Sequence, residues 1–389
     1  MYVETQKTLD EVIAIAKQSD FIAIDTEFIY ERTYYPQLCL IQVASEGFEA
    51  LIDPFAPLDL KSMTDLLVDE TIMKVFHAGS QDRIILYQTL GVPVRPVFDL
   101  QYAVLPLGLP QQMSLSALVR YYCSVSLKKE ESFSDWARRP LTEQQLIYAY
   151  DDVRYLPDVY RKVVKELMDY GRLSWLEDDF KAMEEESNYL VDVSETWKRL
   201  KGATSLRPSQ LALAQDMCAW REQTAQKYNM PKKWVLSDEF IIELCRRSPK
   251  TADDLFMIRG IKNHLNKKWV NEIIDTIAGA KEKPPVRWPT HEKLPRNDNG
   301  LVPKLDLLTT LLHLRAKELH ITSSFLSNHD DLLRLASGQR KDLDILKGWR
   351  RELVGNELVQ LLDGKLAISL NGDDLEVTLL SQAGVNSAN

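Results

Sequence analysis

Three acidic segments in the first half of the chain carry the residues best suited to chemistry. Asp25 and Glu27 stand two residues apart, Asp82 follows in a second segment, and Tyr148 and Asp152 stand four residues apart in a third. Carboxylate oxygens are the ligands that hard divalent cations prefer. A pair of such cations offsets the negative charge of a phosphodiester and lowers the pKa of an attacking water from ~15.7 toward neutrality. These residues therefore predict metal-assisted hydrolysis of a phosphodiester.

The first two acids lie at the end of a predicted strand. Phe21 to Phe28 is a short apolar run with β-branched residues at alternate positions, which is typical of a strand. Side chains alternate between the two faces of a strand, so we expect Asp25 and Glu27 on the same side. Acids at a strand end are, taken alone, most often solvated surface groups.

Asp82 lies at a predicted corner between a strand and a helix. An apolar stretch at residues 73–76 precedes the Gly79-Ser80 break, and a helical pattern then runs through Leu90. An acid at such a corner often does no more than stabilise the helix start through the helix dipole. The corner is nevertheless a place where a metal ligand could be held.

The third segment is predicted to be a helix with a defined start. Thr142 and Gln145 have the spacing of a capping box, so Tyr148 and Asp152 belong to the helix that follows. Residues four apart share one helical face. Asp151 could also reach this face and is the alternative acid. Such a pair is by itself more often amphipathic surface, but the joint occurrence of the three segments favours a metal site.

In its motifs, the first half of the chain resembles ribonuclease D, a family of 3′–5′ exonucleases with four acids and a tyrosine in the site (DEDDy). The resemblance covers residues 1 to about 206. The matching stretches are Asp25-Thr26-Glu27-Phe28 with Glu31 to Pro36 and Leu40-Ile41-Gln42, His77-Ala78-Gly79 with Asp82, Phe98-Asp99, Ser134-Asp135-Trp136, Arg139-Pro140-Leu141, Tyr148-Ala149, Asp152-Val153 and Tyr155-Leu156. Such a set is far more specific than any single motif.

The resemblance implies a role for each residue of the site. Asp25, Glu27 and Asp152 would hold one divalent ion, Mg²⁺ or Mn²⁺, that activates water, while Asp25 and Asp82 would hold a second ion at the leaving 3′ oxygen. Tyr148 would orient the attacking water, because a phenol with an ordinary pKa of ~10 is a poor base at neutral pH. The expected contribution of the site is electrostatic and geometric.

Two positions depart from the family pattern. Arg83 and Ile84 follow Asp82, where the family often has leucine and glutamate, and Lys128-Lys129 stands where an aspartate is common. We interpret both departures as variation at the substrate contact or the surface that leaves the metal ligands unaffected.

Length and composition limit the class of protein. The chain has 389 residues and 45% hydrophobic content, enough for two or three domains. No apolar run approaches the ~20 residues needed to span a bilayer, and the first residues lack a basic region followed by an apolar stretch, so we expect a cytoplasmic protein. Neither the cysteines nor the histidines are spaced as a metal cluster, and no glycine-rich phosphate loop indicates a nucleotide cofactor.

The expected architecture is an α/β domain followed by two all-helical domains. The resemblance implies a ribonuclease H-like mixed sheet in residues 1–206. Residues 207–281 have helical periodicity and resemble the helicase-and-RNase-D C-terminal (HRDC) domain, residues 282–304 form a proline-rich linker, and residues 305–389 predict a second, diverged HRDC-like domain.

The second helical domain is inferred from a similarity between two stretches of the sequence. Phe325-Leu326-Ser327-Asn328 matches Val235-Leu236-Ser237-Asp238 at an offset of 90 residues. Chance similarity between helical segments is the alternative explanation. Asn371-Gly372, between two apolar runs, predicts a hairpin that closes this domain.

Residues 207–281, in the middle of the chain, are also where we expect nucleic acid to bind. Residues 207–281 carry 13 basic and 9 acidic side chains, whereas residues 1–206 carry 21 and 33. Lys232-Lys233-Trp234 and Lys267-Lys268-Trp269 combine basic residues with an aromatic ring, as in surfaces that grip phosphates and stack a base. A core tryptophan flanked by solvated lysines is the more ordinary interpretation. We therefore predict only Lys232 and Lys233 as RNA contacts, which would position phosphates without reading sequence.

The residues predict a phosphodiester hydrolase, and the resemblance implies a 3′–5′ exoribonuclease that releases 5′-mononucleotides from structured RNA, with transfer-RNA precursors as substrates. A DNA 3′–5′ exonuclease is one alternative, because carboxylates do not register a 2′-hydroxyl. A non-catalytic RNA-binding scaffold is another. It would be expected to lack at least one acid, and all four candidates are present.

Overall fold

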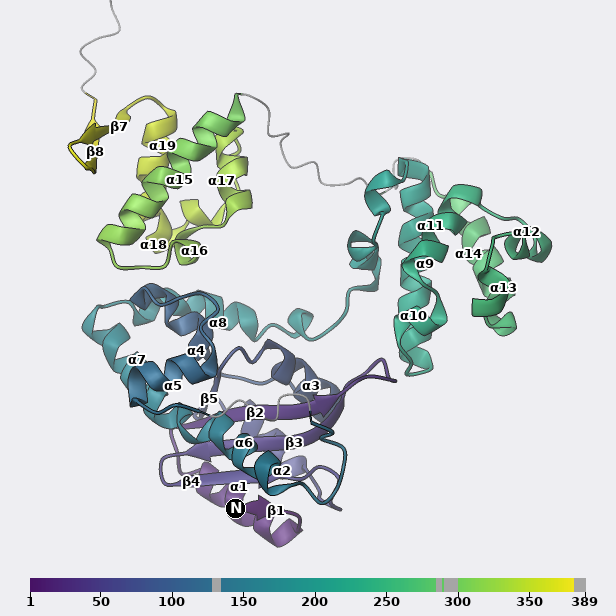
Figure 1. The fold of residues 1–389 in the computed structure, drawn as a ribbon, viewed down its shortest axis with the longest axis horizontal. Helices are drawn as coiled ribbons and strands as arrows, with labels where there is room; N and C mark the ends of the chain where they lie inside the picture. Colours follow the sequence, from purple (N-terminus) through teal and green to yellow (C-terminus); the bar gives the residue numbers. More distant parts are fainter. Residues whose placement is uncertain (128–133, 285–288, 290–299, 381–389) are drawn as a thin grey trace, which may run out of the picture.

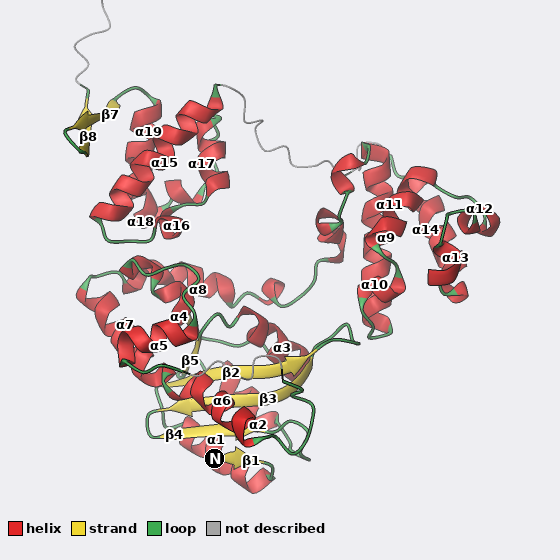
Figure 2. Ribbon diagram, in the orientation of Figure 1, coloured by secondary structure: helices red, strands yellow, loops and turns green. Residues whose placement is uncertain are grey.

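The chain folds into a sheet domain and two helical units, and the computed structural model describes residues 1–127, 134–284, 289 and 300–380. Figure 1 shows a sheet domain at the bottom of the view, a helical unit that stands away from it, and a second helical unit that lies on top of it. Figure 2 shows the strands gathered in the sheet domain and in one small hairpin. Within the described ranges, no helix combines the length and the apolar character needed to cross a membrane.

The sheet domain is built on six strands in the order β1-β4-β3-β2-β5-β6. The strands are β1 (Tyr2–Val3), β2 (Phe21–Ile29), β3 (Gln37–Ser45), β4 (Phe48–Ile52), β5 (Met73–Phe76) and β6 (Val97–Asp99). β2 runs antiparallel to β3 and parallel to β5, so the expected mixed sheet is confirmed. The strand that carries the first two acids therefore lies inside the sheet, held by a neighbour on each side.

Alternate residues of β2 face two different cores. The helices of this domain are α1 (Gln6–Ala16), α2 (Lys61–Val68), α3 (Ser80–Leu90), α4 (Leu100–Ala103), α5 (Leu115–Cys123), α6 (Glu143–Arg154), α7 (Leu156–Asp169) and α8 (Glu177–Met183). Ile22 and Ile24 pack with α1, α2 and α3 on one face of the sheet. Phe21 and Ala23 pack with α5, α6 and α7 on the other face. The same alternation places Asp25 on the side of α6.

The first helical unit is a compact bundle around one long helix. Its helices are α9 (Pro208–Lys227), α10 (Lys232–Val235), α11 (Asp238–Arg247), α12 (Ala252–Phe256), α13 (Ile261–His264) and α14 (Val270–Glu282). Trp197, Leu200 and Leu206 precede α9 and already belong to its core. The expected boundary between residues 206 and 207 therefore divides a packed core, and we propose that the unit begins at Val193, where a 3-10 helix packs against α9.

The second helical unit begins earlier than expected. It contains α15 (Leu301–Glu318), α16 (Ser323–Leu326), α17 (His329–Ala336), α18 (Gly348–Arg350), α19 (Asn356–Leu362) and the hairpin of β7 (Leu366–Asn371) and β8 (Asp374–Leu379). Residues 301–304 are helical, although we assigned them to the linker, because a proline such as Pro303 is tolerated in the first turn of a helix. Most of the rest of that linker lies outside the described residues. The hairpin is present, with Gly372 at a φ of 66° in its turn.

The two helical units share an order of elements. In each, a long helix precedes a four-residue helix and then a third helix that starts at Asp238 or His329. Ser237 and Asn328 hold the N-cap positions, and the buried residues Ile241, Ile242, Leu244 and Cys245 of α11 correspond to Leu332, Leu333, Leu335 and Ala336 of α17. The observed offset is therefore 91 residues at these positions, one more than the offset of 90 residues between the similar stretches of sequence. That the second unit is a diverged HRDC domain remains a prediction.

The second helical unit is docked on the sheet domain through an aromatic interface. The rings of Trp175 and Trp349 stack at 4.8 Å between centroids, and Trp349 Nε1 donates to the Trp175 carbonyl. Thr322 N donates to the Leu105 carbonyl at 3.0 Å. One hydrophobic core runs through both parts, so they form a single packed body.

The first helical unit meets the sheet domain at the loop after β2. The Tyr34 hydroxyl donates to buried Glu222 at 2.6 Å, and the backbone N–H groups of Tyr34 and Tyr35 both donate to Asn229 Oδ1 at 3.1 and 3.0 Å. This polar tether connects the strand that carries Asp25 to the helical unit.

Candidate active site

Three carboxylates from two elements meet beside the sheet. Side-chain oxygens of Asp25 and Glu27 on β2 and of Asp152 on α6 all lie within 4.8 Å of one another. All three side chains are partly buried. Oxygens gathered in this way fit the ligand preference of a hard divalent cation. The structure therefore brings together three of the four acids predicted from the sequence.

The start of α6 is fixed by reciprocal hydrogen bonds. Thr142 N donates to Gln145 Oε1 at 2.9 Å, and Gln145 N donates to Thr142 Oγ1 at 3.2 Å, which is the expected capping box. Tyr148 and Asp152 follow on one face of this helix, and burial, followed by the charge of Asp152, raises the pKa of Tyr148. Tyr148 thus stands at the edge of the acid cluster.

The carboxylate of Asp151 interacts with Arg154 of the same helix. Arg154 donates to Asp151 Oδ1 at 3.3 Å, and the same guanidinium binds the Glu49 carboxylate of β4. Asp151 is outside the group of three acids found among the described residues. The geometry therefore favours Asp152 over the alternative acid.

Asp82 lies close to the cluster but is held by a neighbour of Asp25. Thr26 donates to Asp82 Oδ1 from its backbone N–H at 3.1 Å and from its hydroxyl at 2.5 Å. Asp82 is buried, and its charge acts on Asp25 and Glu27. It is not within the 4.8 Å group found among the described residues, so its part in metal binding remains a prediction. Sequence reasoning did not foresee Thr26 as its partner.

The turn before α3 is fixed by close packing at Gly79 and by hydrogen bonds to the Asp99 carboxylate. A Cβ on Gly79 would meet Phe76 Cβ at 2.4 Å, so only glycine fits at this position. Asp99, at the end of β6, accepts hydrogen bonds from Ala78 N at 3.1 Å and Gly79 N at 2.9 Å. These contacts fix the turn that presents Asp82.

Burial raises the pKa of every acid in the site, and repulsion from nearby carboxylates raises it further. Burial is the largest cause for each of them. The pKa of Glu27 rises to about 9 and that of Asp152 to about 7, with repulsion from Asp152 and Asp151 respectively as the next cause. The pKa of Asp25 is raised well above its ordinary value and that of Asp82 is also raised. This density of negative charge is what a bound divalent cation would neutralise, so the residues fit such an ion.

The two lysine–tryptophan segments differ in the structure. Trp269 is buried, as the ordinary interpretation holds, but Trp234 is 57% exposed, so that interpretation is wrong for Lys232-Lys233-Trp234. Short helix α10 buries only Val235 and leaves the ring outside. Lys232 Nζ lies 3.3 Å from Glu222, while Lys233 is exposed. Both lysines remain predicted RNA contacts.

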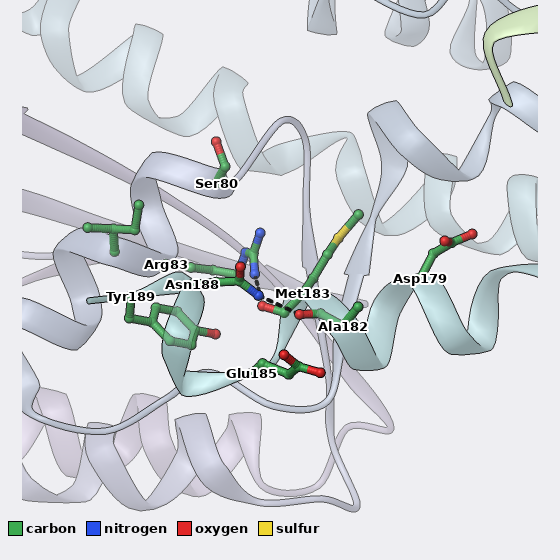
Figure 3. Close-up of a pocket in the computed structure, with 9 residues that line it drawn as sticks. Ser80, Arg83, Asp179, Ala182, Met183, Glu185, Asn188 and Tyr189 are labelled. Atoms are coloured by element: carbon green, nitrogen blue, oxygen red, sulfur yellow. Dashed lines mark hydrogen bonds between the residues drawn. The ribbon is translucent and has the colours of Figure 1, made fainter. Parts of the chain in front are cut away.

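Arg83, one of the departures from the family pattern, is buried beside a surface pocket of about 430 Å³. Figure 3 shows its side chain directed at Met183, whose carbonyl accepts from Arg83 Nη1, with Ser80 and Tyr189 also lining the pocket. The bond ties α3, the helix of Asp82, to the end of α8. Lys128-Lys129, the other departure, lies outside the described residues.

Comparisons with known proteins agree with this geometry. Residues 1–168 match the family model described as 3′-5′ exonuclease, and residues 210–277 match the HRDC domain. A ribonuclease D of Sphingobium indicum is 38% identical and covers 97% of this chain and 98% of its own length. A ribonuclease D of Zymomonas mobilis is 36% identical, with coverages of 96% and 97%.

A solved structure shows the same fold over nearly the whole chain. Escherichia coli RNase D, described as an exoribonuclease involved in structured RNA processing, superimposes with a TM-score of 0.80 at 27% identity and covers 94% of this chain and 98% of its own. The acid cluster lies within the part that matches the exonuclease model. The chain therefore belongs to the ribonuclease D family of 3′–5′ exoribonucleases that use divalent metal ions.

Proposed function

We propose that this exoribonuclease trims the 3′ ends of structured RNAs, transfer-RNA precursors among them, and releases 5′-mononucleotides at the acid cluster. The observation that carries the proposal is the convergence of Asp25, Glu27 and Asp152 within 4.8 Å, with Tyr148 one helical turn before Asp152 on α6. Relatives that cover 96–97% of the chain are ribonucleases D, and one similar solved structure is of an exoribonuclease involved in structured RNA processing.

Each acid has a proposed part in binding two Mg²⁺ or Mn²⁺ ions. Asp25, Glu27 and Asp152 would hold one ion, and Asp25 with Asp82 would hold the other. Bound there, the ions supply an activated water and neutralise charge on the phosphate and the leaving oxygen. The chain itself contributes rigid placement: Thr26 holds Asp82 by two hydrogen bonds, and the capping box holds α6.

Tyr148 is proposed to orient the attacking water as a neutral hydrogen-bonding group. Burial, followed by the charge of Asp152, raises the pKa of Tyr148 far above its ordinary value. The hydroxyl therefore keeps its proton throughout the physiological range and is not the base. Its ring packs against that of Trp136, with 6.0 Å between the ring centres, and this contact restricts its direction, as positioning of a nucleophile requires.

The first helical unit is proposed to guide RNA toward the site. Lys233 and the ring of Trp234 are exposed together on α10. Lys268 Nζ lies 3.7 Å from the centre of the Tyr228 ring on the same unit. Cations and rings in this arrangement bind phosphates and stack bases without sequence preference. The Tyr34 tether connects this unit to β2, so RNA held there lies beside the domain that carries the acids.

The redox state of the cysteines supports a cytoplasmic location. Cys39, Cys123, Cys218 and Cys245 are all free thiols, and three of them are buried. Unpaired buried cysteines are typical of a reducing compartment. We propose the cytoplasm, where transfer-RNA precursors would be met.

The substrate class is tested with a 3′-extended transfer RNA and a single-stranded DNA of matched sequence, each with Mg²⁺, Mn²⁺ or a chelator. We expect mononucleotide release from the RNA that the chelator abolishes. Faster release from the DNA would favour the DNA exonuclease. RNA binding without any release under all metal conditions would favour the scaffold.

A further inference from the structure

Arg139 lies in the segment that leads into α6 and makes five hydrogen bonds. Its Nε and Nη2 donate to the two Asp53 oxygens at 2.5 and 2.8 Å, and Nη1 donates to the carbonyls of Trp136 and Arg138 at 2.8 and 3.0 Å. Nη2 also donates to the Cys39 carbonyl at 2.6 Å. A guanidinium has five N–H donors in a rigid plane, so each donor has a partner and its orientation is fixed.

The Cys39 carbonyl marks an irregularity in the sheet opposite an acid of the site. The pairing of β2 with β3 joins Glu27 to Leu40 and Phe28 to Leu38, which leaves Cys39 without a partner in the register. Such a bulge bends its strand and redirects side chains. Arg139 therefore hydrogen-bonds the backbone of the bulge, next to the residue that pairs with Glu27. A change in the bulge would redirect the Glu27 side chain.

The other carbonyl contacts of Arg139 reach the tyrosine of the site. Trp136 is buried, and its ring centre lies 6.0 Å from that of Tyr148. Gln145, which closes the capping box of α6, also donates from Nε2 to the Asp135 carbonyl at 3.3 Å. The segment that Arg139 holds is thus packed against the first turns of α6 and against the ring of Tyr148.

Asp53 gives Arg139 a fixed anchor. It follows β4, is buried, and also accepts a hydrogen bond from the Tyr2 hydroxyl at 2.6 Å. The guanidinium lies over the Phe55 ring at 4.7 Å, which covers its face. The pair Arg139–Asp53 therefore connects β1, the end of β4, the bulge in β3 and the approach to α6.

We propose that Arg139, anchored by Asp53, is a positioning residue for hydrolysis, which sets the spacing between Glu27 on β2 and Tyr148 on α6. The inference rests on the proposed function, because it assigns a task to the geometry of that same site. Arg139 acts through the backbone of the bulge and through Trp136. A misplacement of about 1 Å in such a site can cost about 100-fold in rate.

The test substitutes Arg139→Lys, which keeps the charge but replaces a planar fork of five donors by a point charge with three. We expect kcat on a 3′-extended RNA to fall about 30- to 100-fold, while KM changes by less than about threefold because Arg139 does not contact RNA in this account. The matched control is Arg154→Lys. Arg154 also joins α6 to β4, by two bonds to Glu49, but it contacts neither the bulge nor Trp136. Its kcat should stay within about twofold of the parent protein.

A second measurement separates positioning from general loss of structure. In a Tyr148→Phe background, the further loss caused by Arg139→Lys should be at least about fivefold smaller than in the parent, since residues that act as a unit are not additive. Equal losses in both backgrounds would overturn the proposal. A kcat of Arg139→Lys within about twofold of the parent would do so as well.

Thermal unfolding and circular dichroism establish that each variant is folded. Should Arg139→Lys not fold, Trp136→Phe replaces it, because Arg139 bonds the backbone carbonyl of residue 136, which this change keeps, while the smaller ring weakens the packing against Tyr148. We expect a loss of kcat of about tenfold that is absent in the Tyr148→Phe background; no loss in the parent background overturns the proposal. Asp25→Ala is run in parallel: full activity of that variant rejects the proposed function itself, whereas an inactive Asp25→Ala beside a fully active Arg139→Lys rejects only this inference.

Discussion

Thr26 donates two hydrogen bonds to one carboxylate oxygen of Asp82, from its backbone N–H at 3.1 Å and from its hydroxyl at 2.5 Å. Thr26 lies between Asp25 and Glu27, so its side chain points away from theirs and toward α3. Thr26 of β2 therefore holds Asp82, the predicted acid of the site that lies on α3. The spacing of the site across β2 and α3 depends on this contact.

Loss of the Thr26 hydroxyl should weaken catalysis. Thr26→Val keeps the shape but removes one hydrogen bond to a carboxylate, an interaction of about 1.5–3 kcal/mol. We expect kcat to fall about tenfold, equivalent to ~1.4 kcal/mol of barrier. Steady-state kinetics on a short RNA measures the change, and Thr26→Ser, which retains the hydroxyl, is the control. Equal activity of Thr26→Val and the parent would show that the bond does not matter for the reaction.

The stability of the metal-free protein should fall as pH rises. The folded-state pKa values of Glu27 and Asp152 are raised, to about 9 and about 7, so the folded protein holds protons that the unfolded chain has released above pH ~4. Stability from this source is complete below the unfolded pKa values and is lost between pH ~4 and ~9. Melting temperatures in chelator should therefore decrease over this interval.

Added Mn²⁺ should raise the melting temperature, and the increase should be larger at pH 8 than at pH 5, because the cation binds the ionised acids. Asp25→Asn removes one of the acids and should reduce this increase. A metal effect of the same size at both pH values would contradict the assignment of the ligands.

Tyr148→Phe should reduce kcat without moving the alkaline limb of the pH profile. The raised pKa of Tyr148 keeps its hydroxyl protonated, so it orients water and does not remove a proton. We expect a loss of about 100-fold, at the lower end of the range for removal of a single positioned hydrogen-bonding group. A pH–rate series for both proteins provides the measurement. Disappearance of an alkaline pKa in the variant would instead identify Tyr148 as a titrating catalyst.

The stacked tryptophans should hold the second helical unit on the sheet domain. Trp349→Ala removes the stack on Trp175 and its hydrogen bond, and large-to-small changes of this kind cost about 3 kcal/mol. Denaturant unfolding should show the loss. Trp234→Ala, at a ring that is 57% exposed, should change stability by less than ~0.5 kcal/mol. Similar stability of the two variants would mean that the interface contributes little.

The charge of Lys233 should matter for RNA binding and not for chemistry. Lys233→Glu is expected to weaken binding of a structured RNA and to reduce the slope of log affinity against log salt by about 1. Hydrolysis of a dinucleotide should be unaffected, because such a substrate does not reach the helical unit. Lys7→Glu, at an exposed position on α1, is the matched control. Equal salt dependence of both variants would remove Lys233 from the RNA path.

Local patterns predicted the parts of the site that depend on neighbouring residues. The alternation along β2 placed Asp25 and Glu27 on one side, and the Thr142–Gln145 capping box located α6 and with it Asp152. Both rest on periodicities of 2 and 3.6 residues, which the sequence shows directly. Long-range contacts were beyond such reasoning.

The bulge at Cys39 and the bonds of Arg139 depend on how β3, β4 and the approach to α6 meet, and no local pattern encodes that meeting. The same limit applies to the two tryptophans. Trp234 and Trp269 follow identical lysine pairs, yet one is exposed and the other buried, because burial is decided by the packing of α10 and α14 against α9. Lys232 likewise pairs with Glu222, which only the tertiary structure brings near.

Whether hydrolysis takes place at the acid cluster is tested most directly by comparing Asp25, which belongs to the cluster, with Asp151, which does not. Product analysis on a 3′-extended transfer RNA with Mg²⁺ should show 5′-mononucleotides from the parent protein and from Asp151→Asn, whose carboxylate lies outside the cluster. Asp25→Ala should release none at a detection limit about 1000-fold below the parent rate. Unchanged mononucleotide release by Asp25→Ala would show that hydrolysis takes place elsewhere in the molecule.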